Sequence, residues 1–235
     1  MKIVGLQKLT LLDFPGKIAC TVFLGGCNFR CPFCHNGQLL GAEEEAIMDV
    51  EGLMAFLESR RGKLEGVCIT GGEPTLQPDL LPLLGRIKGI GYPLKLDTNG
   101  YRPDVLRAVL EEDLADYVAM DIKNSPERYA ETVGLPTVSL AAVEESIRLL
   151  MHSSVEYEFR TTVVRQFHDE ASVADMGRWL LGLGGGGLVR RMFLQPFVDR
   201  ETVLRPGLTA PEESEIRAFS EVLRPFCESV QIRGI

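Results

Sequence analysis

Short apolar runs alternate with longer stretches whose apolar positions recur at helical spacing along this 235-residue chain. The runs at 18–24 and 66–70 are apolar at nearly every position, which is typical of buried strands in a parallel sheet. The stretch at 49–61 carries a stripe of Leu53, Phe56 and Leu57 and predicts a helix. The same criteria predict strands at 94–97, 117–122, 157–164, 192–195 and 229–232, and helices at 79–88, 103–112, 140–152, 171–181 and from Thr209 to Pro225.

This alternation gives six strand–helix units after a short N-terminal segment, residues 1–17, which is expected to form a β-hairpin extension with a turn at 13–16. Repeated strand–helix units predict an α/β fold with a parallel sheet and helices outside it. A closed barrel needs eight units, so six predict an incomplete (β/α)6 barrel at 18–235 within a single domain, 1–235. Such a barrel has a lateral opening, which matters if the substrate is itself a protein.

Three cysteines follow the first buried strand, within Gly-Gly-Cys-Asn-Phe-Arg-Cys-Pro-Phe-Cys-His-Asn at 25–36. The spacing of Cys27, Cys31 and Cys34 lets three thiolates converge on one metal centre. A cubic [4Fe-4S] cluster needs a terminal ligand for each of its four irons, so three cysteines leave one iron open to bind a small molecule. The two glycines before Cys27 allow the backbone to turn tightly beside such a cluster.

The cysteine loop also has three other interpretations. A structural zinc ion would need a fourth ligand, and His35 is the candidate, although its position next to Cys34 makes convergence on one ion awkward. A disulfide framework is typical of small, cysteine-dense secreted domains, which this chain is not. A thioredoxin-like pair of Cys31 and Cys34 would leave Cys27 unexplained.

Ligands of parallel α/β folds bind at the C-terminal ends of strands, so the residues after each predicted strand are candidates for a site. The second strand is followed by Gly71, Gly72, Glu73 and Pro74. The glycines expose backbone groups to a close ligand, and the carboxylate can bind an ammonium group. The third strand is followed by Asp97-Thr98-Asn99-Gly100, a sequence that also fits a simple turn.

Charged residues mark the fourth and fifth strands of the series. Asp121 and Lys123 end the fourth, and the lysine also fits a solvated surface charge. Arg160 lies in the otherwise apolar fifth strand, where a buried charge needs a partner. The partner is either a carboxylate side chain such as Glu158, on the same strand face, or the carboxylate of a bound ligand.

With these motifs in this order, the chain resembles the radical S-adenosylmethionine (SAM) superfamily over nearly its whole length. The His-Asn pair after Cys34 makes it similar to the activating enzymes of glycyl-radical enzymes, and most similar to the activating proteins of anaerobic ribonucleoside-triphosphate reductase. The resemblance implies a radical SAM partial barrel with a [4Fe-4S] cluster on Cys27, Cys31 and Cys34. Some relatives carry a ferredoxin-like insert, but residues 37–67 contain no cysteine, so one cluster is expected.

The resemblance also implies the roles of the other motif residues. The segment from Gly71 through Gly72 and Glu73 to Pro74 would hold the amino group of SAM. Phe33 would lie near the adenine. Asp121, Lys123 and Arg160 would lie in the SAM pocket, where the lysine and the arginine offset the charge of the SAM carboxylate. A monovalent cation would be bound by Asp97, Thr98 and Asp121.

The implied reaction is the reductive cleavage of SAM with an electron from flavodoxin or ferredoxin, and the abstraction of hydrogen from a glycine of a partner enzyme. The expected partner is anaerobic ribonucleotide reductase. The alternatives are a radical SAM enzyme for another glycyl-radical enzyme or a small molecule, a non-catalytic iron–sulfur electron carrier, and a zinc-stabilised interaction module. The missing fourth cysteine and the Gly-Gly-Glu motif argue against the electron carrier.

Net charge and the distribution of apolar residues limit the expected binding partners and cellular location. The net charge of −8 argues against general nucleic-acid binding, which needs a basic surface. No run reaches the ~18 apolar residues of a membrane span, and the N-terminus lacks the long apolar segment of a secretory signal. The expected location is the cytoplasm, where thiols stay reduced. Cys20 and Cys68 fall in apolar strands and are expected in the core.

Overall fold

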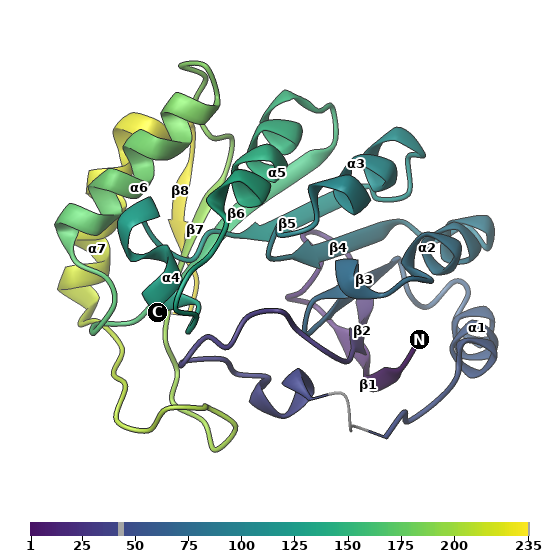
Figure 1. The fold of residues 1–235 in the computed structure, drawn as a ribbon. Helices are drawn as coiled ribbons and strands as arrows, with labels where there is room; N and C mark the ends of the chain where they lie inside the picture. Colours follow the sequence, from purple (N-terminus) through teal and green to yellow (C-terminus); the bar gives the residue numbers. More distant parts are fainter. Residues whose placement is uncertain (42–44, 235) are drawn as a thin grey trace. The chain divides into compact units, whose positions relative to one another are not determined.

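The computed structural model describes residues 1–41 and 45–234, with strands β1 to β8 following their sequence order in an eight-stranded sheet (Figure 1). The chain divides into two compact units. The first unit comprises Met1–Asn28, Gln38–Thr98 and Asp104–Ala119; the second comprises Phe29–Gly37, Asn99–Pro103 and Met120–Ile235. Strand β5 (Tyr117–Asp121) contributes residues to both. The single-domain organisation stays a prediction.

The first unit begins with a hairpin, but its second strand is the first barrel strand rather than part of residues 1–17. Strand β1 (Ile3–Thr10) pairs antiparallel with β2 (Ala19–Leu24), which confirms the N-terminal β extension. Strand β2 then runs parallel to β3 (Gly66–Gly71), and β3 runs parallel to β4 (Leu94–Thr98). The helices and short 3-10 turns of this part are α1 (Val50–Ser59), α2 (Leu80–Gly89), α3 (Pro103–Glu111), η1 (Gly37–Leu40) and η2 (Pro74–Leu76).

Apolar side chains account for the packing of this unit. Strands β2 and β3 are buried over most of their length, as the unbroken apolar runs predicted. Helix α1 buries Leu53, Met54 and Leu57, whereas Phe56 of the predicted stripe is half-buried and lies beneath the guanidinium of Arg60. The apolar stripe of α1 is therefore shifted by part of a turn toward Met54. Figure 1 shows α1 and α2 beside the strands of this unit.

The second unit continues the parallel arrangement. Strand β6 (Glu156–Val163) runs parallel to β7 (Met192–Pro196), and β7 runs parallel to β8 (Val230–Ile232). Helices α6 and α7 lie side by side next to β7 and β8 (Figure 1). The helical segments are α4 (Tyr129–Thr132), α5 (Leu140–His152), α6 (Glu170–Leu183), α7 (Glu213–Leu223), η3 (Pro126–Arg128) and η4 (Arg224–Phe226).

The start of the last helix differs from the prediction. Helix α7 begins after Glu212, whose capping box is completed by Glu215, so the helix start predicted at Thr209 is wrong. Pro211 restricts the residue before it to extended backbone, which prevents a helix from beginning at 209. Thr209 instead exchanges hydrogen bonds of 3.1 Å with the side chain of Gln166.

The remaining features agree with the α/β prediction. The α/β class and the largely parallel sheet are confirmed. Cys20 and Cys68 are fully buried, and burial raises the pKa of the Cys20 thiol to about 12. Within 1–41 and 45–234, every helix is too short or too polar to cross a membrane.

Candidate iron–sulfur and cofactor site

The first unit joins the start of the cysteine loop to the Gly-Gly-Glu-Pro motif. Leu24, which ends β2, pairs in parallel register with Gly71, which ends β3. The N–H of Gly72 donates to the carbonyl of Leu24 at 2.9 Å, and the N–H of Glu73 donates to the carbonyl of Gly26 at 2.8 Å. Two motifs far apart in the sequence therefore contact each other through their backbones.

Both glycines of the motif are required by this contact. Gly71 has a φ of +136°, and a Cβ there would lie 2.1 Å from the carbonyl oxygen of Leu24. A Cβ on Gly72 would lie 2.1 Å from the carbonyl oxygen of Gly26. Any larger residue would push the motif away from the turn that precedes Cys27.

The Glu73 carboxylate is buried and held in one orientation. Its side chain caps η2 by accepting from the N–H of Thr75 at 3.0 Å, and Oε1 also accepts from Thr75 Oγ1 at 2.5 Å. Oε1 accepts a third hydrogen bond from Thr98 Oγ1 at 2.8 Å. Thr98, a predicted cation ligand, is thus a direct partner of the residue predicted to bind the SAM amino group.

The other predicted cation ligand in this unit has a cationic neighbour. Asp97 forms an ion pair with Lys95, whose side chain is 2% exposed. Sequence reasoning missed Lys95, although alternation along β4 places it on the same face as Asp97. A monovalent ion at Asp97 would share this carboxylate with the lysine.

The second unit contains the later part of the cysteine loop. Cys31 is buried and Cys34 is half-buried, and the N–H of Cys34 donates to the carbonyl of Cys31 at 3.0 Å. Phe33 is 4% exposed and packs on Phe167, with ring centroids 5.8 Å apart. All six cysteines of the chain lie in the described segments, and none is in a disulfide.

A carboxylate between two cations forms the charged part of this unit. Asp121 accepts from Lys123 Nζ on Oδ2 and from Arg160 Nε on Oδ1, each at 3.0 Å. Burial alone raises the pKa of Asp121, but the charges of Lys123 and Arg160 outweigh it and lower this pKa to about 2. The trio therefore carries one net positive charge, which suits an anionic ligand group.

Lys123 also acts on the cysteine loop. Burial opposes its charge, but the carboxylate of Asp121 and, to a smaller extent, the negative charge of a Cys31 thiolate raise the pKa of Lys123 above its ordinary value. A lysine that stays protonated near Cys31 favours the thiolate, which is the form that ligates metals.

The partner of Arg160 was not anticipated. Glu158, the carboxylate considered in the sequence, is fully buried and forms a bidentate pair with Arg233, with both distances 2.8 Å. The Arg233 guanidinium also lies 3.4 Å from the ring centroid of Phe193. Asp121 is the carboxylate that pairs with Arg160, and it is itself one of the predicted site residues.

Two further buried polar residues adjoin these elements. His168 is 4% exposed, and its Nε2 donates to the carbonyl of Lys123 at 2.9 Å. The hydroxyl of Tyr129 is buried and makes no hydrogen bond of ordinary geometry within 1–41 and 45–234, with the backbone of Lys123 as a polar neighbour. Burial raises the pKa of this hydroxyl, and the charge and backbone of Lys123 oppose the rise. No motif distinguishes Tyr129, so the sequence offered no signal for it.

These residues fit the expected cluster. In the described part of the chain, no three side chains of His, Cys, Asp or Glu lie close enough to hold one metal ion. A [4Fe-4S] cluster makes a different demand, because each cysteine binds its own iron. Within the second unit, Cys31 and Cys34 lie outside disulfides, and the ammonium group of Lys123 adds a positive charge near Cys31, which suits that demand.

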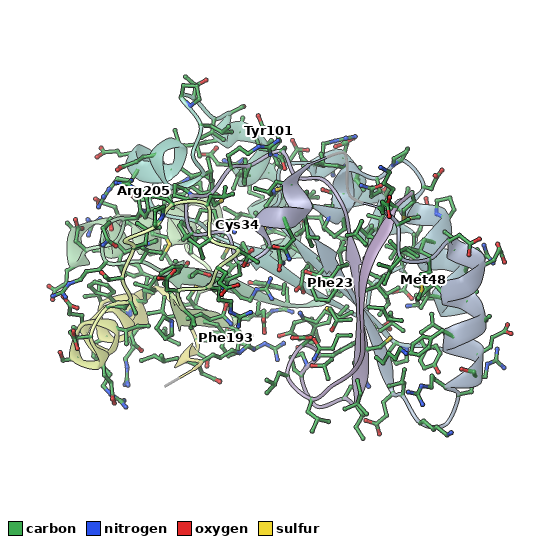
Figure 2. All side chains as sticks on the ribbon, turned by 90° about the horizontal axis from the view of Figure 1, so that it is seen from below. Phe23, Cys34, Met48, Tyr101, Phe193 and Arg205 are labelled. Atoms are coloured by element: carbon green, nitrogen blue, oxygen red, sulfur yellow. The ribbon has the colours of Figure 1, made fainter. Side chains whose placement is uncertain are left out.

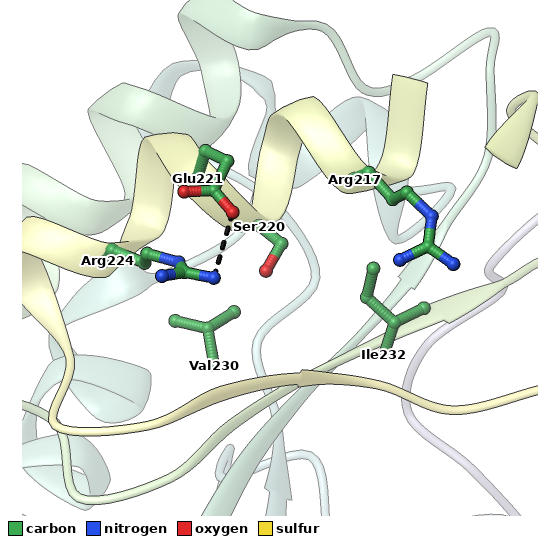
Figure 3. A pocket seen from close by; sticks show the side chains of 6 residues that line it. All are labelled: Arg217, Ser220, Glu221, Arg224, Val230 and Ile232. Carbon is green, nitrogen blue, oxygen red and sulfur yellow. Dashed lines mark ion pairs between the residues drawn. The ribbon is translucent and has the colours of Figure 1, made fainter. Parts of the chain in front are cut away.

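A hollow elsewhere on the second unit lacks such chemistry. It has a volume of about 320 Å³ between α7 and β8 (Figure 3) and is lined by Arg217, Ser220, Glu221, Arg224, Val230 and Ile232. Arg224 pairs with Glu221 at 2.9 Å, and Arg217 pairs with Glu213 at 2.6 Å. Both guanidinium groups are therefore already neutralised.

Comparison with known proteins identifies relatives of this chain. A model of the radical SAM superfamily matches residues 21–176. A Methanocaldococcus jannaschii protein with the provisional name of a glycyl-radical enzyme activating enzyme is 29% identical over 237 residues, which cover 98% of this chain and 95% of that protein. The pyruvate formate-lyase-activating enzyme of Clostridium pasteurianum is 33% identical over 132 residues, covering 52% of each chain.

A solved structure supports the fold independently of these sequences. A domain of the pyruvate-formate lyase-activating enzyme from Bacteroides vulgatus superposes with a TM-score of 0.59 at 20% identity. The match covers 72% of this chain and 99% of that domain. The chain therefore has the α/β fold of radical SAM structures, as the strand–helix pattern predicted.

Proposed function

The chain belongs to the radical SAM superfamily, and we propose that it is an activating enzyme that generates a glycyl radical on a partner enzyme. Family membership makes it a radical SAM enzyme with a [4Fe-4S] cluster and SAM as cofactors. The observation that carries the finer proposal is the similarity to a glycyl-radical enzyme activating enzyme over 98% of this chain and 95% of that relative. The His-Asn pair after Cys34 agrees with it.

Cys27, Cys31 and Cys34 would hold the cluster, which supplies the electron for the reductive cleavage of SAM when it is bound. In the first unit, Glu73 would bind the SAM ammonium group, and its contacts with Thr75 and Thr98 would fix the carboxylate before the ligand arrives. Gly71, Gly72 and Pro74 would keep this part of the backbone open to the ligand.

In the second unit, Lys123 and Arg160 would bind the SAM carboxylate. Asp121 orients both cations and leaves one net positive charge to offset the ligand. Phe33, buried against Phe167, would provide an apolar surface for the adenine. A monovalent cation at Asp97, Thr98 and Asp121 is part of the same proposal.

The proposed partner is anaerobic ribonucleotide reductase, with flavodoxin or ferredoxin as the electron donor and the cytoplasm as the location. Protein substrates need no nucleotide-binding motif, and none was found in the sequence beyond the SAM motifs. The main alternative is a different glycyl-radical enzyme, such as the pyruvate formate-lyase served by the Clostridium pasteurianum relative.

The test is to incubate the anaerobically reconstituted protein with SAM, a reductant and either reductase or lyase, and to record EPR spectra. A glycyl radical on the reductase supports the full proposal. A radical on the lyase alone would reject the reductase and retain the activating function. SAM cleavage without a radical on either would favour a small-molecule substrate, and the absence of 5′-deoxyadenosine would favour an electron carrier. The Cys31→Ala variant is the negative control.

A further inference from the structure

The segment after β7 contacts the cysteine loop at several points, all within the second unit. Residues 197–205 form this segment, which is called the strap below. Figure 2 labels Cys34 in the cysteine loop and Arg205 in the strap. Neither segment belongs to a helix or strand around these positions, so backbone ladders do not fix their geometry.

His35, directly after Cys34, is the centre of these contacts. Its Nε2 bonds with the carbonyl oxygen of Val198 at 2.8 Å, and its ring stacks on Phe197 with centroids 5.7 Å apart and planes inclined by 16°. The hydroxyl of Thr202 donates to the carbonyl oxygen of His35 at 2.6 Å. The strap thus binds both the side chain and the backbone of the residue that follows a cluster cysteine.

Two more contacts hold the loop on either side of His35. The N–H of Arg205 donates to the carbonyl oxygen of Pro32, the residue after Cys31, at 2.9 Å. Gly37 lies so close to the strap that a Cβ there would be 2.3 Å from the carbonyl oxygen of Thr202. The loop from 32 to 37 is therefore in contact with the strap near both of its ends.

The contact of His35 with the strap defines which ring nitrogen carries hydrogen. Because a carbonyl only accepts, the Nε2 atom must carry the ring hydrogen that faces Val198.

We propose that the strap fixes the Cys31–Cys34 part of the cluster-binding loop before the cluster binds, with His35 and Thr202 as positioning residues. A loop without ladder hydrogen bonds loses conformational freedom when it binds a rigid ligand, and contacts that restrict it beforehand reduce this cost. The proposed function assigns neither residue. The inference rests on the cluster assignment, but the exchange of loop amides in the iron-free protein can be measured whatever the partner enzyme is.

The test uses paired variants of the full chain. Thr202→Val removes the hydroxyl at nearly constant volume, and Thr202→Ser retains it. His35→Ala removes the imidazole, and His35→Gln retains an N–H at the position of Nε2. Glu201→Gln changes the charge of an exposed strap residue without touching these contacts. Hydrogen exchange is followed for peptides covering 31–37 in the iron-free protein, and iron loss to a chelator is followed in the reconstituted protein.

The Val and Ala variants are expected to speed loop exchange and iron loss about five-fold each, the effect of one lost hydrogen bond. The Ser, Gln and Glu201→Gln variants should stay close to wild type. The proposal would be overturned if Thr202→Val and His35→Ala both left loop exchange and iron loss unchanged. It would also be overturned if Thr202→Ser and His35→Gln changed them as much as Thr202→Val and His35→Ala do. Global unfolding of Thr202→Val would also overturn it, because the contact is assigned a local role. If exchange responds and iron loss does not, the strap orders the loop without serving the cluster, and the inference fails.

Discussion

Arg160 of β6 donates through Nε to Oδ1 of Asp121, the last residue of β5, over 3.0 Å. Lys123 reaches the other oxygen of the same carboxylate at 3.0 Å. One acidic side chain therefore separates two cations that are both mostly removed from solvent, each being 16% exposed. This arrangement keeps the cations oriented and leaves the trio with a single net positive charge.

The Asp121→Asn substitution is expected to lower the free energy of unfolding by about 1–3 kcal/mol, because two shielded cations would lose their counter-charge. Chemical denaturation at neutral pH measures the change. Asp175→Asn removes the same charge from an exposed pair with Arg178 and should cost less than about 0.5 kcal/mol. Equal losses in the two variants would show that the Asp121 network contributes no more than a surface ion pair.

The Gly72→Ala substitution is expected to destabilise the protein by about 1–3 kcal/mol, because the new methyl group would clash with the Gly26 carbonyl. The cysteine loop should shift with Gly26, so iron content after reconstitution should fall as well. Thermal unfolding and iron analysis test both effects.

Gly85 provides the matched control for this change. It is exposed in α2, and a Cβ there would meet its nearest atom at 3.9 Å. Gly85→Ala should raise stability by about 0.5–1 kcal/mol through helix propensity. Retention of wild-type stability and iron by Gly72→Ala would contradict the close contact between the two motifs.

Strand order and the location of the motifs could be predicted because both depend on local patterns. The apolar runs of β2 and β3 identify buried strands, and parallel pairing then brings their C-terminal ends together. The close contact of Gly72 with Gly26 follows from that register. Helix α4 escaped prediction because its four residues are too few for a helical period to be visible.

Side-chain partners could not be predicted, because they depend on register and loop paths rather than on local sequence. Alternation along β6 places Glu158 and Arg160 on the same face of the strand. The Glu158 carboxylate nevertheless pairs with Arg233, and the Arg160 guanidinium pairs with Asp121. The bond between Thr202 and His35 joins residues 167 positions apart along the chain. Such a contact exists only once the segment after β7 has folded over the loop.

Tyr129→Phe is expected to stabilise the iron-free protein by about 1–3 kcal/mol, because it removes a buried hydroxyl that makes no hydrogen bond of ordinary geometry in the described protein. Thermal unfolding of the iron-free protein measures this gain. After reconstitution with iron and sulfide the gain should shrink or reverse, since the hydroxyl lies where the charges of Cys31 and Lys123 act on it. A variant less stable than wild type without iron would show that the hydroxyl already has a partner.

His168 should make stability depend on pH. Burial lowers its pKa below the ordinary value of 6.5, so the folded protein binds fewer protons there than the unfolded chain as pH falls below about 6.5. Its contribution to stability is complete above 6.5 and decreases as pH falls toward the lower folded pKa.

The slope of the unfolding free energy against pH is measured by urea unfolding of the iron-free protein between about pH 5 and 7.5. This range brackets the ordinary histidine pKa. His168→Asn should flatten the slope, because the variant has no titrating group at this position. His152→Asn, on the exposed end of α5, should leave it unchanged. Identical slopes for wild type and His168→Asn would contradict the role of buried His168.

The most direct measurement is the formation of 5′-deoxyadenosine from SAM by anaerobically reconstituted wild type, Cys31→Ala and Cys227→Ala. Cys227 is buried near the end of η4, and burial raises the pKa of its thiol to about 12, so it serves as the control cysteine. The account predicts iron and 5′-deoxyadenosine in wild type and Cys227→Ala and neither in Cys31→Ala. Wild-type SAM cleavage by Cys31→Ala, or iron-loaded wild type that never consumes SAM, would contradict it.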